Sequence, residues 1–361
     1  MAEKKCTGAD VRLGSTGGQA VLEGVMMKSK DKIAISVRDS KGEIRTDVRD
    51  SKPLTAKNKF FRIPFIRGIV GFIDSMMLSI DTLNRSADML GLEEQEESKF
   101  EKWLTKTFGK SIAVIASVLG TILGLVLSVV LFMWLPKFIS NFVVTSEMVE
   151  VNYAFAVLKS AIQGVMRIII FLLYIALVTL IPDMKRTFMY HGAEHKSIFC
   201  HESYEELTVE NVRKQSRFHP RCGTSFLVVM MVLGILISIP FANLKDGIYL
   251  VLKLLTLPVI VGLGYEFIRY AGRHDNAFVR VISAPGLWVQ RLTTKEPTDD
   301  MIEVAIRSLK ASLPDVYPEI VSELEEAENM EDISAEDARS NTGDTSEEKT
   351  QEPDVSQDNQ Q

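Results

Sequence analysis

The segment His191-Gly192-Ala193-Glu194-His195 carries the side chains best suited to chemistry in this chain. In a helix, residues four positions apart lie one turn apart on the same face, so the two imidazoles would stand together. Two imidazoles in this arrangement bind a divalent metal, most often zinc. A carboxylate beside them can hold the water that the metal activates and accept its proton, as in inverted zinc-hydrolase motifs. The spacing therefore predicts a divalent-metal site, with zinc as the expected ion and Glu194 as the catalytic base.

A metal site of this kind needs a third ligand, and several residues could supply it. His219 is the first choice, because four of the five histidines lie between positions 191 and 219. Glu266 is the second, since it lies at the end of an apolar segment that should reach the same side of the membrane. Cys222 and His201 are weaker candidates, and a thiolate at Cys222 would favour a structural zinc site. The alternative is a chance motif, with Glu266 reaching the membrane surface or paired with Arg269 or Arg221.

The glycine-rich segment 17–27 is the second feature that stands out. Its glycines suit tight backbone turns, and no Gly-Lys-Ser/Thr sequence of a phosphate-binding loop follows them. We expect a loop that enters a strand over residues 20–27, with further strands at 33–37 and 44–48. Glu23 is either another carboxylate at the metal site or, in the favoured interpretation, a surface residue of the first strand.

Long apolar segments dominate the middle of the chain, and each is long enough to cross a bilayer, which takes about 20 residues. The first has no charged side chain, whereas the second contains Lys159 and Arg167, and the last contains Lys253 and Glu266. The pattern predicts a membrane α-helical protein with about four transmembrane helices and a small β-containing cytoplasmic N-terminal unit. The four segments are residues 111–135, 154–181, 226–241 and 248–267.

The distribution of lysine and arginine around these segments predicts their orientation. Basic residues are dense before the first segment, between the second and third, and after the fourth. The first connection, 136–165, has only Lys137 and Lys159. Because basic residues concentrate on the cytoplasmic side, both termini and the connection 182–225 should be cytoplasmic, in a cell inner (plasma) membrane.

The remaining segments are more polar. Residues 59–110 mix apolar and charged side chains, which fits an amphipathic helix in the membrane interface or, equally, a helix packed on the soluble unit. A helix should begin after Thr298. Residues 319–361 hold fifteen acidic and two basic residues, which leaves 39 basic against 32 acidic residues, a charge of +7, before them. We expect this tail to be disordered.

These features divide the chain into five parts. They are a cytoplasmic β-rich segment (1–58), an amphipathic helical segment (59–110), a four-helix membrane domain (111–267) with a histidine-rich cytoplasmic loop (182–225), a cytoplasmic C-terminal segment (268–318) and the acidic tail (319–361).

Several motifs together resemble the YqhQ-like family of bacterial membrane proteins, over about residues 14–312. The resemblance implies a bacterial inner-membrane protein of unknown function, described only as a predicted metal-dependent enzyme. It implies a metal site at His191, Glu194, His195, His219 and Cys222, and it names no substrate. The motifs are Gly-Gly-Gln-Ala-Val-Leu-Glu-Gly-Val-Met-Met (17–27), Tyr-His-Gly-Ala-Glu-His-Lys (190–196), His-Pro-Arg-Cys-Gly-Thr-Ser-Phe (219–226), Tyr-Glu-x-x-Arg (265–269), Ala-Pro-Gly-Leu-Trp (284–288) and Gln-Arg-Leu-Thr-Thr (290–294).

Two functions remain open at this point. The first is a metal-dependent hydrolase at the cytoplasmic membrane face, acting on a lipid or peptide substrate. The second is a non-enzymatic scaffold or assembly factor with a structural His/Cys site. A transporter is a weaker third option, since the apolar segments carry few polar residues. The expected partner is the lipid bilayer, with no nucleic acid.

Overall fold

The computed structural model describes residues 16–91 and 110–326, apart from Arg221, Asn243, Lys245, Gly272, Arg273 and Asp275. The chain divides into two compact units, residues 1–313 and 314–361. In the second unit residues 319–326 are helical, so the tail predicted to be disordered is ordered at its start. The rest of that prediction, 327–361, falls outside the described residues.

The first element of the larger unit is a four-stranded antiparallel sheet whose strands follow one another in chain order. The single strand predicted over 20–27 is wrong, because the chain reverses at residues 22–23 and Val21 pairs with Gly24. Glu23 takes a left-handed φ of 46° there, so a turn forms without the glycine or asparagine that usually announces one. The strands are β1 (Gly17–Val21), β2 (Gly24–Lys28), β3 (Lys32–Arg38) and β4 (Ile44–Asp50).

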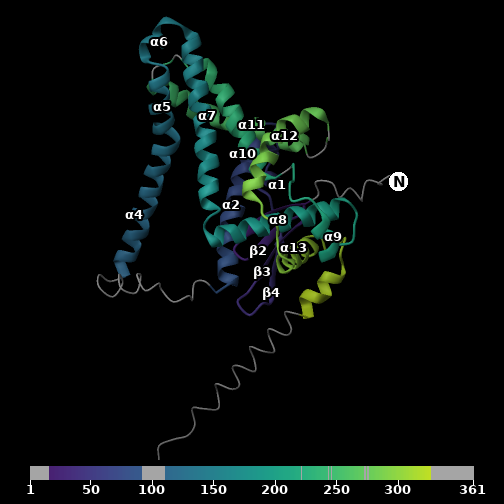
Figure 1. Ribbon diagram of the computed structural model, residues 1–361. Helices are drawn as coiled ribbons and strands as arrows, with labels where there is room; N and C mark the ends of the chain where they lie inside the picture. The colour runs from purple at the N-terminus through teal and green to yellow at the C-terminus, as the bar shows by residue number, and fades with distance from the viewer. Residues whose placement is uncertain are drawn as a thin grey trace, which may run out of the picture. The chain divides into compact units, whose positions relative to one another are not determined.

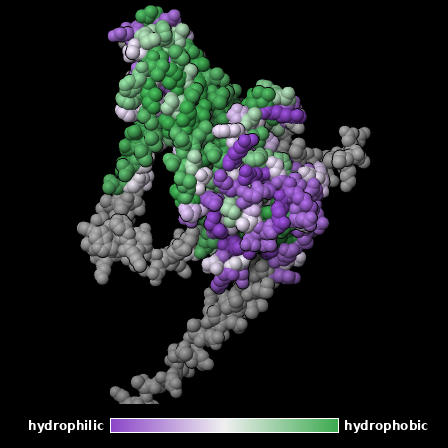
Figure 2. Space-filling view, in the orientation of Figure 1, coloured by the Kyte–Doolittle hydropathy of each residue, from purple (hydrophilic) through white to green (hydrophobic). Residues whose placement is uncertain are grey.

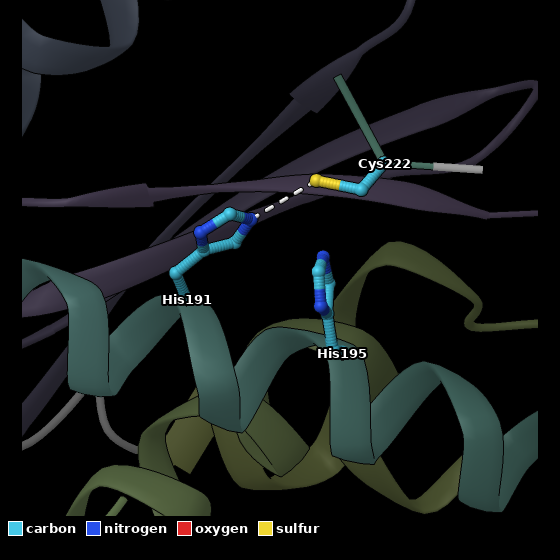
Figure 3. A group of neighbouring side chains, drawn as sticks. All are labelled: His191, His195 and Cys222. Atoms are coloured by element: carbon cyan, nitrogen blue, oxygen red, sulfur yellow. Dashed lines mark hydrogen bonds between the residues drawn. The ribbon is translucent and has the colours of Figure 1, made fainter. Parts of the chain in front are cut away.

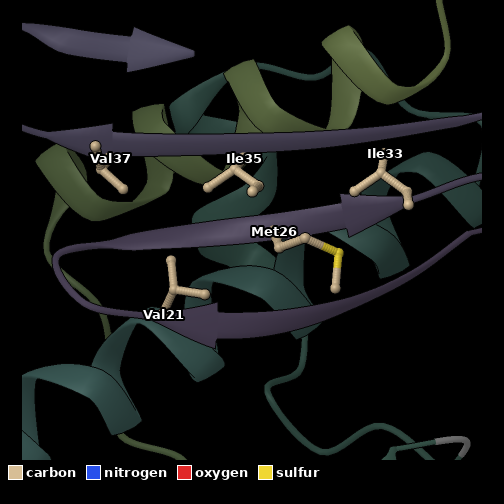
Figure 4. Packing of buried hydrophobic residues seen from close by; sticks show 5 residues of the cluster. All are labelled: Val21, Met26, Ile33, Ile35 and Val37. Carbon is tan, nitrogen blue, oxygen red and sulfur yellow. The ribbon is translucent and has the colours of Figure 1, made fainter. Parts of the chain in front are cut away.

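One face of the sheet packs against the long helix α2 (Ile66–Met89). Alternate residues of a strand point to the same face, and five of them form a buried apolar cluster (Figure 4): Val21, Met26, Ile33, Ile35 and Val37. Leu78, Met89 and Leu90 cover this cluster from the helix side. The predicted helix of segment 59–110 therefore packs on the β unit over its described part.

The same helix also reaches the membrane domain. A Cβ at its Gly68 would lie 3.0 Å from the Cα of Gly262, so the two backbones approach closely. Large apolar side chains remain exposed on α2, among them Phe72, Met77 and Ile80. An exposed apolar face of this kind suits the membrane interface, and the interfacial position of the helix stays a prediction.

The opposite face of the sheet is covered by two helices from distant parts of the chain, α8 (Pro182–Glu202) and α13 (Asp299–Ser312). The Ser308 hydroxyl of α13 donates to the Ala34 carbonyl at 3.0 Å, and Arg38 forms an ion pair with Glu303. Figure 1 shows both helices against the strands. As predicted, α13 begins directly after Thr298.

Within the described residues, four helices are long and apolar enough to cross a membrane, as the hydropathy pattern predicted. Figure 2 shows an apolar surface over α4 (Lys110–Val129) and α7 (Tyr153–Val178) and a hydrophilic one around α8 and α13. The first apolar helix extends further than predicted, because α4 continues through a π-helical turn, η3 (Val130–Trp134), into α5 (Leu135–Val143). The spans are Val118–Val143, Tyr153–Val178, Gly223–Phe241 and Gly247–Ala271.

The contacts between these parts constrain the membrane topology. The sheet precedes the first span, α8 lies between the second and third, and α13 follows the fourth, yet all three pack together. They must therefore lie on one side of the membrane, which agrees with four crossings. That this side is the cytoplasm stays a prediction.

The predicted histidine-rich loop is largely helical, since α8 and the short α9 (Val209–Lys214) occupy most of it. Beyond the fourth span a further helix, α12 (Ala277–Thr293), packs on α10 (Gly223–Ser238). The other elements are α1 (Leu54–Lys57), η1 (Lys59–Arg62), α6 (Ser146–Val151), α7 (Tyr153–Val178), η4 (Ile239–Phe241) and α11 (Asp246–Ala271).

The packing of α13 on the sheet can be tested with one truncation. Leu309 is fully buried, so Leu309→Ala should destabilise the fold by about 2–5 kcal/mol. The same change at Leu254, which is 57% exposed on a membrane span, is the matched control. Thermal unfolding of the detergent-purified protein should show a clearly lower midpoint for Leu309→Ala only. Equal midpoints for the two variants would show that α13 does not contribute to the core.

Candidate functional site

The histidine motif lies on α8, as the sequence predicted. Pro182 occupies the first turn with Asp183, and His201 lies in the last turn, an arrangement that suits the helix dipole. Residues 192–198 are all buried, so this helix is enclosed on every side. Enclosure brings Glu194, His195 and Lys196 out of water, and buried charged groups require partners.

The partners of these buried charges come from several elements. Lys196 pairs with Glu296 and donates to the Arg213 carbonyl at 2.9 Å. Glu194 is 5% exposed and accepts from the backbone amide of Gly18 in β1. The centre of α8 is thus fixed by polar contacts as well as by packing.

Three ligand-type side chains converge at this point: His191, His195 and Cys222. Their donor atoms all lie within 4.8 Å of one another, the one group of at least three potential ligands among the residues that the structure describes. Figure 3 shows the two imidazoles one turn apart on α8, both on the side facing Cys222. His191 Nε2 lies 3.2 Å from Cys222 Sγ. Cys222 is positioned as the N-cap of α10, so two helices supply the group.

Each imidazole is oriented by a backbone carbonyl. His191 Nδ1 lies 2.8 Å from the Thr293 carbonyl oxygen, and His195 Nδ1 lies 2.6 Å from that of Arg217. A carbonyl only accepts, so both Nδ1 atoms donate. The Nε2 atoms are thereby directed toward the shared space. Metal-ligating histidines are oriented in the same way by a partner on their second nitrogen.

One atom of the group supports a metal ligand directly. His195 Nε2 is buried and has no hydrogen-bond partner among the described residues. An unsatisfied buried polar atom costs about 1–3 kcal/mol, and coordination to an ion would remove that cost. The residues present therefore fit a divalent metal.

Cys222 and His191 interact as a thiolate and an imidazolium. Burial opposes ionisation of Cys222, but the charges of His191 and His195 hold the pKa of its thiol well below the ordinary value. Burial lowers the pKa of His191, yet the Cys222 thiolate outweighs it and raises that pKa to about 9. Burial raises the pKa of Glu194, and the two histidines partly offset it. A thiolate is the form of cysteine that binds metals.

His219, the first-choice third ligand, lies next to this group but outside it. Its ring centroid is 5.5 Å from that of His195, while its Nε2 lies 3.6 Å from a Glu202 carboxylate oxygen. Its backbone forms two hydrogen bonds with the side-chain amide of Gln290, which is fully buried. Cys222, ranked lower from sequence, occupies the third position instead.

The two other predicted carboxylates form ion pairs elsewhere. Glu266 makes two hydrogen bonds to the Arg67 guanidinium of α2, with Nε 2.6 Å from Oε1. Glu23 pairs with Arg186 and lies 3.3 Å from the Tyr190 hydroxyl. Glu266 is therefore held between α2 and α11. The alternative of an arginine pair had named Arg269 or Arg221, whereas the partner is Arg67, which lies 199 positions earlier in the sequence.

The sequence prediction missed the residues that position α8 and its histidines. A Cβ at Gly18 would lie 2.8 Å from Glu194 Cγ, and one at Gly192 would lie 2.1 Å from the Lys295 carbonyl oxygen. Both glycines therefore permit close approach to α8. Gln290 ties the segment before α10 to α12 through His219 and Ser225. All three lie in motifs quoted for the family resemblance, which was the available signal.

Comparisons with known proteins agree on a family and give no activity. The model of the family described as "Protein of unknown function (DUF1385)" matches residues 63–315. The "Uncharacterized protein YqhQ" of Bacillus subtilis (strain 168) is 33% identical over 298 residues, which cover 82% of this chain and 92% of that protein. No solved structure matches the chain. These descriptions support the predicted YqhQ-like family, and neither names a metal or a reaction.

The close approach at Gly18 gives a test with a matched control. Gly18→Ala should displace the Glu194 side chain or the strand, at a cost of about 1–3 kcal/mol. Gly17→Ala should be tolerated, because a Cβ at Gly17 meets nothing within 4 Å. Thermal unfolding of both variants measures the difference. A Gly18→Ala protein as stable as Gly17→Ala would contradict the described packing of Glu194.

Proposed function

Given that the chain belongs to the DUF1385 family of proteins of unknown function, we propose that it is a metal-dependent hydrolase acting at the membrane surface. The observation that carries this proposal is the convergence of His191, His195 and Cys222, with a buried glutamate beside them. Catalytic zinc sites use three protein ligands drawn from histidine, cysteine and carboxylate, and they keep a fourth position for water or substrate.

The chain's own residues take distinct roles in this proposal. His191 and His195 bind through Nε2, each held by its carbonyl partner, and Cys222 binds as a thiolate. A divalent ion held there would supply Lewis acidity and lower the pKa of a bound water. Glu194 would receive the proton, since its Oε2 lies 3.9 Å from His191 Nε2, at the edge of the ligand group. Burial raises the pKa of this carboxyl, so its carboxylate accepts a proton more readily than an exposed one would.

The substrate class follows from location. The sheet, α8 and α13 lie on one side of the membrane, and α2 exposes apolar side chains beside them. A lipid or a membrane-associated peptide would reach such a site along the bilayer surface. In the proposed orientation this is the cytoplasmic face of the plasma membrane, with both termini on that side.

A structural metal site is the second candidate, and the depth of the group favours it. His195 is 1% exposed, and the group joins α8, the N-terminus of α10 and, through carbonyls, the segments at Arg217 and Thr293. A metal at such a junction would hold the sheet side to the membrane helices. In that case the protein would be a scaffold or assembly factor.

Metal content tests the site itself. The purified wild type, prepared without chelators, should contain about one divalent ion per chain, and His191→Ala, His195→Ala and Cys222→Ala should each lose it. His274→Ala and Cys200→Ala are the matched controls, because these residues lie outside the ligand group. Elemental analysis gives the result. A metal-free, folded wild type would overturn the proposal in both its catalytic and its structural form.

Glutamate neutralisation separates the two roles. Glu194→Gln should keep the metal and lower hydrolysis of p-nitrophenyl acetate or p-nitrophenyl phosphate by at least about 100-fold, the usual contribution of a general base. A wild type that binds metal but hydrolyses neither probe, and that loses thermal stability on chelation, would support the structural role. Full activity in the Glu194→Gln variant would exclude Glu194 as the base.

A further inference from the structure

A second polar centre lies among the membrane helices. It is a cavity of about 780 Å³ lined by residues of η3, α5, α6, α7 and α11. Because α5 is the far end of the first span and α6 lies in the connection between the first two spans, this cavity opens toward the side of the membrane opposite the sheet and the histidine group. It shares no residue with that group.

Positive charge dominates the cavity wall. Four basic residues line it, Lys137, Lys159, Arg167 and Lys253, against one acidic residue, Glu150, a balance of +3. Two lysines are the only basic residues of segment 136–165. That side of the protein is otherwise poor in basic residues, so its few cations gather at one place.

The position of Arg167 makes the arrangement unusual. It is the fifteenth of the 26 residues of α7, close to the middle of the span. A guanidinium at that depth opposes membrane insertion, and charged residues inside spans generally mark a ligand or ion site. Lys253 lies seven positions into α11, with its Nζ 5.5 Å from the Tyr249 ring centroid, so a second span contributes a cation to the same wall.

The backbone facing Arg167 is irregular in a way that the sequence explains. Pro136 has no N–H, so it cannot bond the Phe132 carbonyl one turn earlier. The helix there becomes π-helical, with the Leu135 N–H bonded to the Val130 carbonyl. Arg167 Nε donates to the freed Phe132 carbonyl at 3.1 Å. Single π-turns in α-helices occur frequently at functional sites.

The rest of the wall is half polar and half apolar. Gln163 donates to the Ser140 hydroxyl at 3.0 Å and lines the cavity beside Arg167. Val129, Met133 and Trp134 supply apolar surface from the first span. A cationic wall with amide groups suits a phosphate, and the adjoining apolar surface suits a hydrocarbon chain.

We propose that this cavity binds the phosphate headgroup of an anionic amphiphile, with Arg167 and Lys253 contacting the phosphate. The headgroup would enter between α7 and α11, and its chain would lie along Trp134 and Met133. A free phosphate ion shares the headgroup chemistry, so the two sources must be separated by experiment. The alternative is that Arg167 only braces the π-helical turn.

Trp134 provides the reporter. The chain has three tryptophans, so Trp103→Phe with Trp288→Phe leaves Trp134 alone in the cavity wall. This protein is placed in nanodiscs that contain brominated phosphatidylglycerol or brominated phosphatidylcholine, both of which quench nearby tryptophan. We expect stronger quenching by the anionic lipid, with a preference that falls about fivefold per removed charge in Arg167→Gln and Lys253→Gln. Lys185→Gln, exposed outside the cavity, is the matched charge control.

Each outcome decides the proposal. Stronger quenching by the anionic lipid that is kept in Lys185→Gln and lost in both cavity variants supports a headgroup site. If added inorganic phosphate abolishes this lipid preference, the site binds a soluble phosphate instead. Equal quenching by the two lipids in the parent protein overturns the proposal. A lipid preference that persists in both folded cavity variants also overturns the proposal. If Arg167→Gln then also loses stability, the role of Arg167 is to stabilise the π-helical turn. Size-exclusion profiles identify the folded variants.

Discussion

The enclosure of α8 is the constraint on which the rest of the structure depends. A helix that is buried on every side over residues 192–198, and yet carries a glutamate, a histidine and a lysine there, must find a partner for each charge. Those partners come from β1, from the segment after α12, and from the backbone near α9. Satisfying these charges therefore brings together regions that are far apart in sequence, and the ligand group forms where they meet.

The same constraint explains why small residues appear at specific positions. Gly18 and Gly192 allow a strand and a backbone carbonyl to approach α8 more closely than any side chain would permit. Gln290 is fully buried, and its side-chain amide forms hydrogen bonds with both the N–H and the carbonyl of His219. A loss of any of these would leave buried polar groups without partners, which is costly in a low-dielectric interior.

Much of the fold could be predicted because its signals are local. Four apolar segments are unmistakable at bilayer length, and the spacing of His191 and His195 places them on one helical face. The turn at residues 22–23 was missed, since a glutamate occupies its left-handed position. Sequence ranked Glu266 above Cys222 as a third ligand, whereas the folded chain brings Cys222 beside the two histidines and pairs Glu266 with Arg67. Proximity of this kind depends on how α10, α11 and α2 pack. No periodicity in the sequence carries that information.

The hydrogen bond between Ser308 and Ala34 joins residues 274 positions apart. During synthesis the strands emerge first, α8 follows after the first two membrane segments, and α13, which completes the cover of the second face, emerges only after all four. Until then the sheet exposes an apolar face that includes Val25 and Met27, which are fully buried in the finished protein. Full burial of this face of the sheet therefore waits for α13, a part of the chain synthesised after the whole membrane domain.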